Sequence, residues 1–401
     1  MLQEDTTSMS EITAGRQVGG FIGTVARFNW RAYGMIIALL LIAVMFDILT
    51  EGIFLSSRNL AQLMRQSAVL VVVATGVAVL IIQGEIDLSI GSAVYLTGLA
   101  AAYAETQWGF GTVEAILFAL AVGLVIGCWQ GFWVAFVGLP SFVVTLAGLL
   151  GLRGAGFVWS NAATYAPMNA THVAISESFI SPEWSVVVVA AVLALFIAIV
   201  FWRWSVQRRR FGAEAMPPRR LIKPVVVAIL GAAIILYAAL GFRGIPMAVV
   251  VALAVAGTLS FVTLGTIFGR QLYAVGGNRE AAFLSGIDIR RNLFYSFLIM
   301  GAIYAIGGVL TTARLNAIAP AVGEFLELEA IAAAVIGGIS LSGGIGTVYG
   351  AIVGVLLLVV VDNGMSLLNV NSFIQLVVKA LLLGFAVWFD LATRPGGRAR
   401  R

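Results

Sequence analysis

The chain has 401 residues, of which 61% are hydrophobic and 11% are charged, and its mean hydropathy is +1.02. Soluble domains contain about 25% charged residues, so this composition excludes a soluble globular protein. The apolar runs are long and continuous rather than alternating, which excludes a transmembrane barrel and predicts an all-α, polytopic helical membrane protein. The formal net charge of +5 comes mainly from arginines between the apolar runs. We interpret it as an orientation signal rather than as a surface for nucleic acid.

The sequence contains one cysteine, Cys128, and one histidine, His172. A single residue of each kind excludes an internal disulfide and a cluster of cysteine and histidine ligands, so we expect no metal site. The pattern G-x-x-x-x-G-K-[ST] of a nucleotide-binding P-loop is absent from the sequence. We therefore expect no cofactor on this chain, and we expect His172 to be an ordinary loop residue.

The first apolar run follows a polar segment, residues 1–31, that we place on the cytoplasmic side. Within it, residues 17–30 mix Val, Phe and Trp with Arg, which fits either a helix lying on the inner leaflet or a disordered tail. The apolar run that follows lacks a small-residue cleavage site, so we expect it to be an uncleaved first span.

About twelve apolar runs approach the roughly 20 residues that a membrane-crossing helix needs. The transmembrane region is therefore expected to cover residues 32–390. The fifth and tenth runs are short and rich in glycine, and we expect them to be re-entrant or broken. The runs are 32–49, 66–83, 88–104, 113–137, 141–158, 184–204, 224–242, 246–268, 291–311, 327–342, 346–368 and 372–390.

The positions of the arginines predict the orientation of these spans. With about twelve crossings, the arginine-rich segments before the first span, after the sixth, within 270–290 and in the basic tail 391–401 all fall on one side. Short positive loops mark the cytoplasm, so both termini are expected to be cytoplasmic. Arg58 and Arg65, in the first external loop, run against this rule.

Residues 269–291 form a short polar island between two long apolar runs. Asn278 is a favourable N-cap and Gly286 a favourable C′ residue, so we expect about two helical turns between them. Ile287 can fold back as the apolar contact of the C-terminal cap, and Asp288 can cap the next membrane helix.

A helix of this length is marginal alone in water, so the short helix in the island is expected to be held by docking. Ala281, Ala282 and Leu284 offer a small surface of low relief to a partner. The same stretch also fits an ordinary polar connector between two spans, but the rest of the chain favours the docking interpretation.

Two carboxylates, Glu85 and Asp87, lie between apolar runs together with Ser89. Charges at membrane depth are costly and usually face a cavity or a partner, so these residues are candidates for the lining of a vestibule or gate. A solvated loop in which Asp87 caps the following span is equally compatible with the pattern.

The stretch 84–92 has a weak internal echo in 337–347, because both contain an I-x-L-S sequence followed by I-G-[ST]. Transporters commonly contain internal repeats and bind substrate at the interface between them. Coincidence between two glycine-rich helix joints is the alternative.

The stretch 139–148 contains Phe142 and Thr145, which could contact a substrate, although its glycines favour close helix packing. Arg153 follows it and needs a carboxylate or water. Its possible partners are Glu85, Asp87, Glu327 and Glu329.

Three acidic residues, Glu324, Glu327 and Glu329, precede the tenth apolar run. They can complement the dipole of that helix, line the mouth of a pathway or pair with Lys379. Asn363 interrupts an apolar run near an external turn, where a capped helix end is the simpler explanation. On the external side, residues 159–183 and 311–327 could receive a soluble binding protein.

Together these stretches resemble the sugar-importing ABC permeases of the ribose, galactose and xylose group. The stretches GEIDLSIGS, LPSFVVTLAGLLGLRG, YAVGGNREAAFLSGI, ELEAIAAAVIGGISLSGGIGTVYGA and DNGMSLL occur in the order found in that family. The resemblance extends from about residue 50 to the C-terminus and implies a core of ten helices. Residues 184–242 add a helix pair with an arginine-rich loop, similar to the xylose subunit, as are residues 55–60 and 387–388.

This resemblance implies that the chain is a permease in the bacterial inner membrane and performs no bond chemistry. The implied partners are a second copy of the chain, two cytoplasmic ATPase subunits that bind ATP and Mg²⁺, and a periplasmic sugar-binding protein. D-Xylose is the favoured sugar. The residues implied in coupling to the ATPase are Gly277, Asn278, Arg279, Glu280, Ala281, Ala282, Leu284, Ser285, Gly286 and Ile287.

Two alternatives remain open from the sequence. The first is the same type of importer for ribose, arabinose, galactose or another small polar solute. The second is an ion-coupled secondary transporter, which the intramembrane acidic residues and the possible repeat would support.

Overall fold

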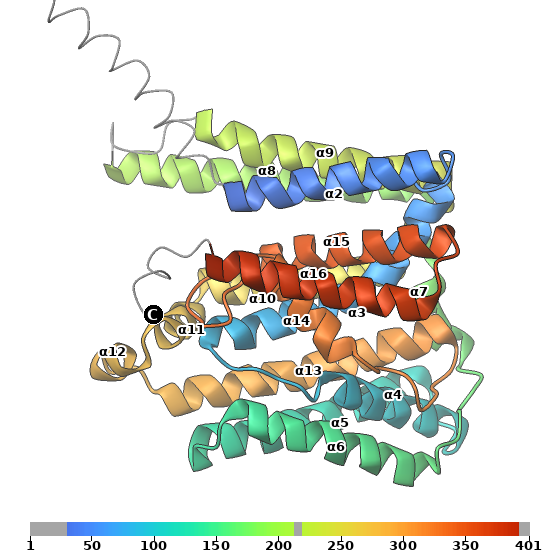
Figure 1. Cartoon of the computed structure of the whole chain (residues 1–401), viewed down its shortest axis with the longest axis vertical. Helices are drawn as coiled ribbons and strands as arrows, with labels where there is room; N and C mark the ends of the chain where they lie inside the picture. Colours follow the sequence, from blue (N-terminus) through green and yellow to red (C-terminus); the bar gives the residue numbers. More distant parts are fainter. Residues whose placement is uncertain (1–29, 212–218, 393–401) are drawn as a thin grey trace, which may run out of the picture.

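The computed structural model describes residues 30–211 and 219–392 (Figure 1). These residues are mostly helical, and each apolar run predicted from the sequence is helical over most of its length. The two strands, β1 (Phe179–Ile180) and β2 (Ile245–Pro246), pair in antiparallel. The helices are α2 (Trp30–Leu49), α3 (Ser57–Gln83), α4 (Ile90–Thr106), α5 (Thr112–Phe132), the π-helix η1 (Trp133–Val137), α6 (Ser141–Ser160), α7 (Ala170–Glu177), α8 (Pro182–Phe211), α9 (Arg219–Gly241), α10 (Met247–Gly265), α11 (Ile267–Gly277), α12 (Arg279–Leu284), α13 (Ile289–Leu315), α14 (Leu326–Ile336), α15 (Val348–Leu367) and α16 (Ser372–Ala392).

Helix α3 is the centre of the molecule, and α10, α13, α14 and α15 pack around it. Its residues are apolar on all sides, and its membrane-spanning part is 94% buried. A helix that is hydrophobic all round is a core helix. The neighbouring helices therefore carry the lipid-facing surface, and α3 carries the contacts that hold them together.

Eight of the described helices are long and apolar enough to cross a membrane. Helix α14 has only 11 residues, which gives about 17 Å of rise. The tenth apolar run, predicted over 327–342, is therefore helical only as far as Ile336, and the expectation that it is broken is confirmed. The total number of spans and their orientation remain predictions.

The expectation that the fifth run is broken was wrong, because α6 is continuous over 20 residues. Its glycines serve helix packing instead. A β-carbon at Gly156 would overlap the ring of Tyr95, and one at Gly148 would lie 2.8 Å from the amide nitrogen of Gln130. Small residues let neighbouring membrane helices approach closely, so the glycine-rich pattern indicated contact rather than a break.

The extra helices α8 and α9 pack against each other as an antiparallel pair, and α9 also packs against α3 (Figure 1). Strand pairing of β1 with β2 and the contact of Gly241 with Ser57 tie this pair to the body. Most of the predicted N-terminal interfacial segment, the tip of the arginine-rich loop and most of the basic tail lie outside the described residues.

Helix α2 begins and α16 ends at the side of the molecule where α12 lies, on the left in Figure 1. We call this side the α12 end. The C-terminal end of α8 also lies there. The arginine-rich ends of the described helices thus gather on one side, as the charge pattern predicted.

The opposite end contains α7 and the two long loops that were predicted to receive a binding protein. Tyr165 and Ile318 join these loops through a pair of backbone hydrogen bonds of 3.0 Å each. Arg65, which runs against the charge rule, forms an ion pair with Glu177 of α7. Its charge is therefore balanced within the protein.

His172 is fully buried, so the expectation of an ordinary loop residue was wrong. Its Nδ1 lies 2.7 Å from Oε1 of Glu105, and its Nε2 lies 2.8 Å from Oγ1 of Thr312. Glu105 also accepts a hydrogen bond of 2.9 Å from the backbone N–H of Asn169. These contacts attach α7 to the ends of α4 and α13.

Replacement of His172 by Ala is expected to destabilise the protein by about 1–3 kcal/mol, because it removes the imidazole that is hydrogen-bonded to Oε1 of the buried Glu105 and to the hydroxyl of Thr312. The thermal transition of the purified protein in detergent should fall, and protease cleavage within residues 159–183 should become faster. The exposed Thr164→Ala is the control. Equal transition temperatures for the two variants would contradict the assigned role of His172.

Candidate functional site

The short helix α12 forms where the capping residues predicted it. The side chain of Asn278 accepts a hydrogen bond of 2.9 Å from the backbone N–H of Ala281. Gly286 has a φ of +82°, and the N–H of Ile287 donates to the carbonyl of Ala282 at 3.1 Å. Asp288 caps α13 through the N–H of Arg291 at 3.1 Å. Both ends of α12 are therefore closed by local hydrogen bonds.

The exposed surface of α12 differs from the predicted one. Ala282 is only 3% exposed and packs against the protein itself, so it does not offer a surface to a partner. Phe283 and Leu284 are 68% and 79% exposed, and Ala281 is exposed beside them. Phe283 was not among the residues predicted from the sequence to contact a partner. A large aromatic residue in an otherwise polar island was the available signal.

Helix α11 holds α12 against the core through backbone contacts. A β-carbon at Gly276 would overlap the carbonyl oxygen of Ile82 at the end of α3. The same carbonyl accepts a hydrogen bond of 2.7 Å from the N–H of Gly344, and the hydroxyl of Tyr273 donates to the carbonyl of Gly346 at 2.8 Å. The two stretches of the internal echo thus meet at α11, because Gly343 also lies against Gly84.

Charged and amide side chains reinforce this attachment. Arg279, the first residue of α12, forms an ion pair with Glu85, whose side chain is only 8% exposed. Gln83 donates to Asn292 at 2.7 Å, and Asn292 donates to Gln271 of α11 at 3.3 Å. One of the predicted pathway residues, Glu85, is therefore directly joined to the predicted coupling helix.

Asp87 belongs to a buried hydrogen-bond network rather than to an open surface. Its Oδ1 accepts from the backbone N–H and the hydroxyl of Ser89 at 2.8 and 2.7 Å, and its Oδ2 accepts from Tyr304. Gln130 donates to Ser89 at 2.6 Å and accepts from Tyr304 at 3.0 Å. Thr145 is also buried and donates to the carbonyl of Ile86 at 3.2 Å. The burial of these groups indicates packing of α4, α5, α6 and α13 around the carboxylate.

The remaining pathway candidates lie elsewhere. Glu329 accepts from Lys379 at 2.5 Å, as one of the sequence-based alternatives predicted, and Asp362 lies 2.8 Å from the same ammonium group. Asn363 exchanges hydrogen bonds of 2.8 and 3.1 Å with Asn59. These contacts join α14, α15, α16 and α3. They are separate from the Asp87 network, both in the sequence and in the fold.

Two further side chains answer questions raised by the sequence. Phe142 is 53% exposed on α6. Arg153 donates to the backbone carbonyls of Pro320 and Val322 at 3.0 and 2.7 Å and lies over the ring of Tyr95. Backbone carbonyl oxygens thus supply the hydrogen bonds of Arg153, and the carboxylate of Glu327, one of its predicted partners, attracts its charge. A pathway role for any of these residues remains a prediction.

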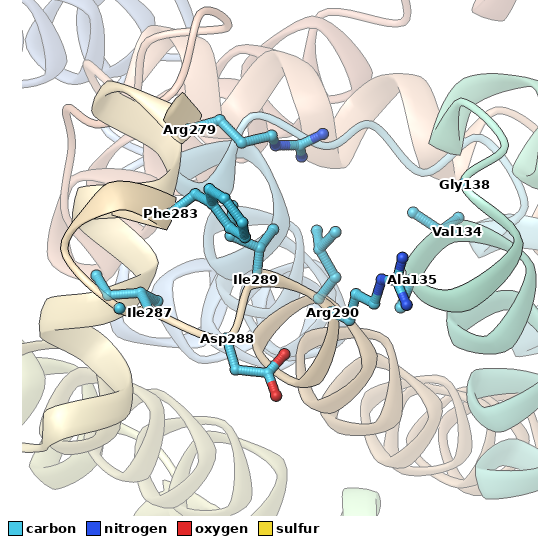
Figure 2. Close-up of a pocket in the computed structure, with 11 residues that line it drawn as sticks. Val134, Ala135, Gly138, Arg279, Phe283, Ile287, Asp288, Ile289 and Arg290 are labelled. Atoms are coloured by element: carbon cyan, nitrogen blue, oxygen red, sulfur yellow. The ribbon is translucent and has the colours of Figure 1, made fainter. Parts of the chain in front are cut away.

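A cleft of about 530 Å³ separates α12 from the π-helix η1 (Figure 2). Phe283 and Ile287 line it on the side of α12, and Val134 and Ala135 line it on the side of η1. Arg290, at the start of α13, extends across the cleft toward Ala135. The cleft thus has apolar residues on both sides, and Arg279, Asp288 and Arg290 also line it.

Residues 59–217 and 220–387 match the model of a protein family that is described as the permease component of the branched-chain amino acid transport system. The chain belongs to this permease family. It is accordingly a multi-pass protein of the inner membrane. No solved structure matches the chain.

Curated relatives include transport permeases for sugars. The xylose transport system permease protein of Haemophilus influenzae is 40% identical over 371 residues, which cover 91% of this permease and 97% of the relative. That of Escherichia coli is 38% identical over 383 residues, covering 94% and 95%. The ribose import permease protein of Escherichia coli is 31% identical over 355 residues, covering 88% and 92%.

Replacement of Gly276 by Ala should separate α11 from the end of α3, because the added methyl group would overlap the carbonyl of Ile82. We expect a loss of about 1–3 kcal/mol of stability, as in other overpacked interiors, measured by thermal unfolding in detergent. The matched control is Gly277→Ala, since a β-carbon there meets nothing within 4 Å. The same transition temperature for both variants would show that the close contact does not constrain α11.

Proposed function

We propose that this permease is the membrane-spanning subunit of an ATP-driven importer of a monosaccharide, with D-xylose as the first candidate. The chain is similar over nearly its whole length to two xylose permeases, and more distantly to permeases for ribose and D-allose. Its extra helices α8 and α9 lie within the residues that align with the xylose relatives. The protein itself carries out no bond chemistry in this proposal.

The observation that supports energy coupling best is the construction of α12. It is capped at both ends, presents Phe283 and Leu284 outward and is joined to the core through Gly276 and the Glu85–Arg279 ion pair. The sequence contains no P-loop of its own. A separate cytoplasmic ATPase subunit that binds ATP and Mg²⁺ would therefore press on α12, and the rigid attachment would carry the movement to the ends of α3 and α13.

The proposed assembly contains two copies of this permease, two ATPase subunits and one periplasmic sugar-binding protein. The binding protein would dock on the side opposite α12, where the loops that contain Tyr165 and Ile318 are joined by backbone hydrogen bonds. The α12 end would then face the cytoplasm, in agreement with the arginine-rich helix ends that gather there.

Reconstitution tests the proposed transport activity directly. Proteoliposomes that contain the permease, its ATPase and its binding protein should accumulate radiolabelled D-xylose only when ATP is supplied on the side of the ATPase. Unlabelled D-xylose should compete better than ribose, arabinose or leucine. Stronger competition by one of these would reassign the substrate, whereas accumulation driven by a proton or sodium gradient without the ATPase would contradict the ATP-driven mechanism.

Substitution of Ala281 by Trp should lower ATP-driven uptake and ATPase association at least roughly tenfold, equivalent to about 1.4 kcal/mol of docking free energy. The added bulk would lift the partner from the exposed side of α12 without filling the protein interior. Capture of sugar by the binding protein should be unchanged. Ala254→Trp, on the exposed side of α10, is the control, and normal uptake by the Ala281 variant would remove α12 from the coupling mechanism.

A further inference from the structure

We propose that the cleft between α12 and η1 is a second part of the ATPase docking surface, and that it receives an acidic side chain of the ATPase subunit on Arg290. This inference rests on the proposed function, because it assumes that an ATPase subunit docks on α12. Beyond docking on α12, it assigns the ATPase a second contact in the cleft and a negatively charged group at that contact.

The first observation is the charge balance around the cleft. Arg279 is paired with Glu85, and Asp288 is paired with Arg291 at 3.1 Å. Among residues 30–211 and 219–392, no hydrogen bond or ion pair engages the side chain of Arg290. The cleft therefore contains one uncompensated positive charge, which favours a carboxylate from a partner.

The second observation is the direction of Arg290 and the surface around it. Figure 2 shows its side chain lying across the cleft toward Ala135, with Phe283 entering from the side of α12. Arg290 itself is exposed to solvent. A partner that covered the apolar sides of the cleft would remove water from around the guanidinium group and strengthen its attraction to a carboxylate of the partner.

The third observation is the exposed apolar surface on both sides of the cleft. Phe283 and Leu284 are exposed on one side, and Phe136, Val137 and Leu139 are 45%, 47% and 41% exposed on the other. Phe136, Val137 and Leu139 adjoin Val134, Ala135 and Gly138, which line the cleft together with Phe283. Apolar residues next to a polar, charged group are typical of an interface core with a specific anchor.

The π-helix η1 supplies the geometry of the second side. It continues α5 for five residues, ends at Gly138 with a φ of +84° and turns directly into Pro140 and α6. Short π-helical segments occur mostly at functional positions. A partner seated in the cleft would contact α12 and the α5–α6 turn at the same time, and would thus couple two separate parts of the permease.

The test compares three purified permeases for binding of the ATPase subunit of the same transport system in lipid nanodiscs. Arg290→Glu should bind the ATPase at least about tenfold more weakly than the unmodified protein, since like charges would meet in the cleft. Arg270→Glu is the matched control, because it changes the net charge equally from an exposed position on the neighbouring helix α11 and does not line the cleft. Its affinity should change less than about threefold.

A compensating change identifies the partner group. Replacement of single Asp or Glu residues on the ATPase surface by Lys should, at one position, restore binding to Arg290→Glu and weaken binding to the unmodified permease. The difference between the two permeases should shrink as the salt concentration rises. Thermal unfolding of each variant, measured in parallel, keeps a loss of folding distinct from a loss of docking.

Each other outcome overturns part of the scheme. Equal ATPase affinity for Arg290→Glu and the unmodified protein would remove the cleft from the docking surface, and equal weakening by Arg270→Glu would reduce the effect to general positive charge. Loss of bound anionic lipid with unchanged ATPase affinity would assign the cleft to a lipid headgroup instead. Failure of the unmodified permease to bind the ATPase at all would contradict the proposed function itself.

Discussion

Backbone-to-backbone contact at the end of α3 determines where the functional surface of this permease lies. The carbonyl of Ile82 accepts the N–H of Gly344 and faces the bare α-carbon of Gly276. No side chain fits between these three segments, so their separation is set by van der Waals distance and by one hydrogen bond. Such a contact has little freedom to yield, and α11 and α12 are consequently positioned by α3, the helix around which the others pack.

The side-chain contacts around this point extend the same attachment in two directions. Glu85 binds the first residue of α12, while Asp87, two residues further, organises a buried network with Ser89 and Tyr304 between four helices. A displacement of α12 therefore reaches α4 and α13 through groups that are close together in the chain. The ion-pair cluster of Lys379 lies apart from this route and joins α14, α15 and α16.

Predictions from short sequence patterns were confirmed where the structure depends on residues that are neighbours in the chain. Asn278, Gly286 and Asp288 cap helices as their side chains and conformational freedom predicted. Prediction was weaker for residues whose partners are remote in sequence. His172 is hydrogen-bonded to Glu105, and Arg153 donates to the carbonyl of Val322. Neither pairing could be predicted from the residues next to it in the sequence. The interior orientation of Ala282 was likewise invisible, because alanine fits both a partner surface and a packed contact.

The sequence by itself determined that the protein is helical and embedded in a membrane, where the helices lie and that a short capped helix interrupts them. Hydropathy, capping residues and arginine positions are local properties, and the bilayer and the backbone act on them directly. Only the tertiary structure decided which side of each helix is buried, which charges are paired and that α12 faces η1 across a cleft. When nearly every position of a helix is apolar, the hydrophobic periodicity does not indicate which side of the helix is buried. These features therefore depend on contacts between residues far apart in the chain.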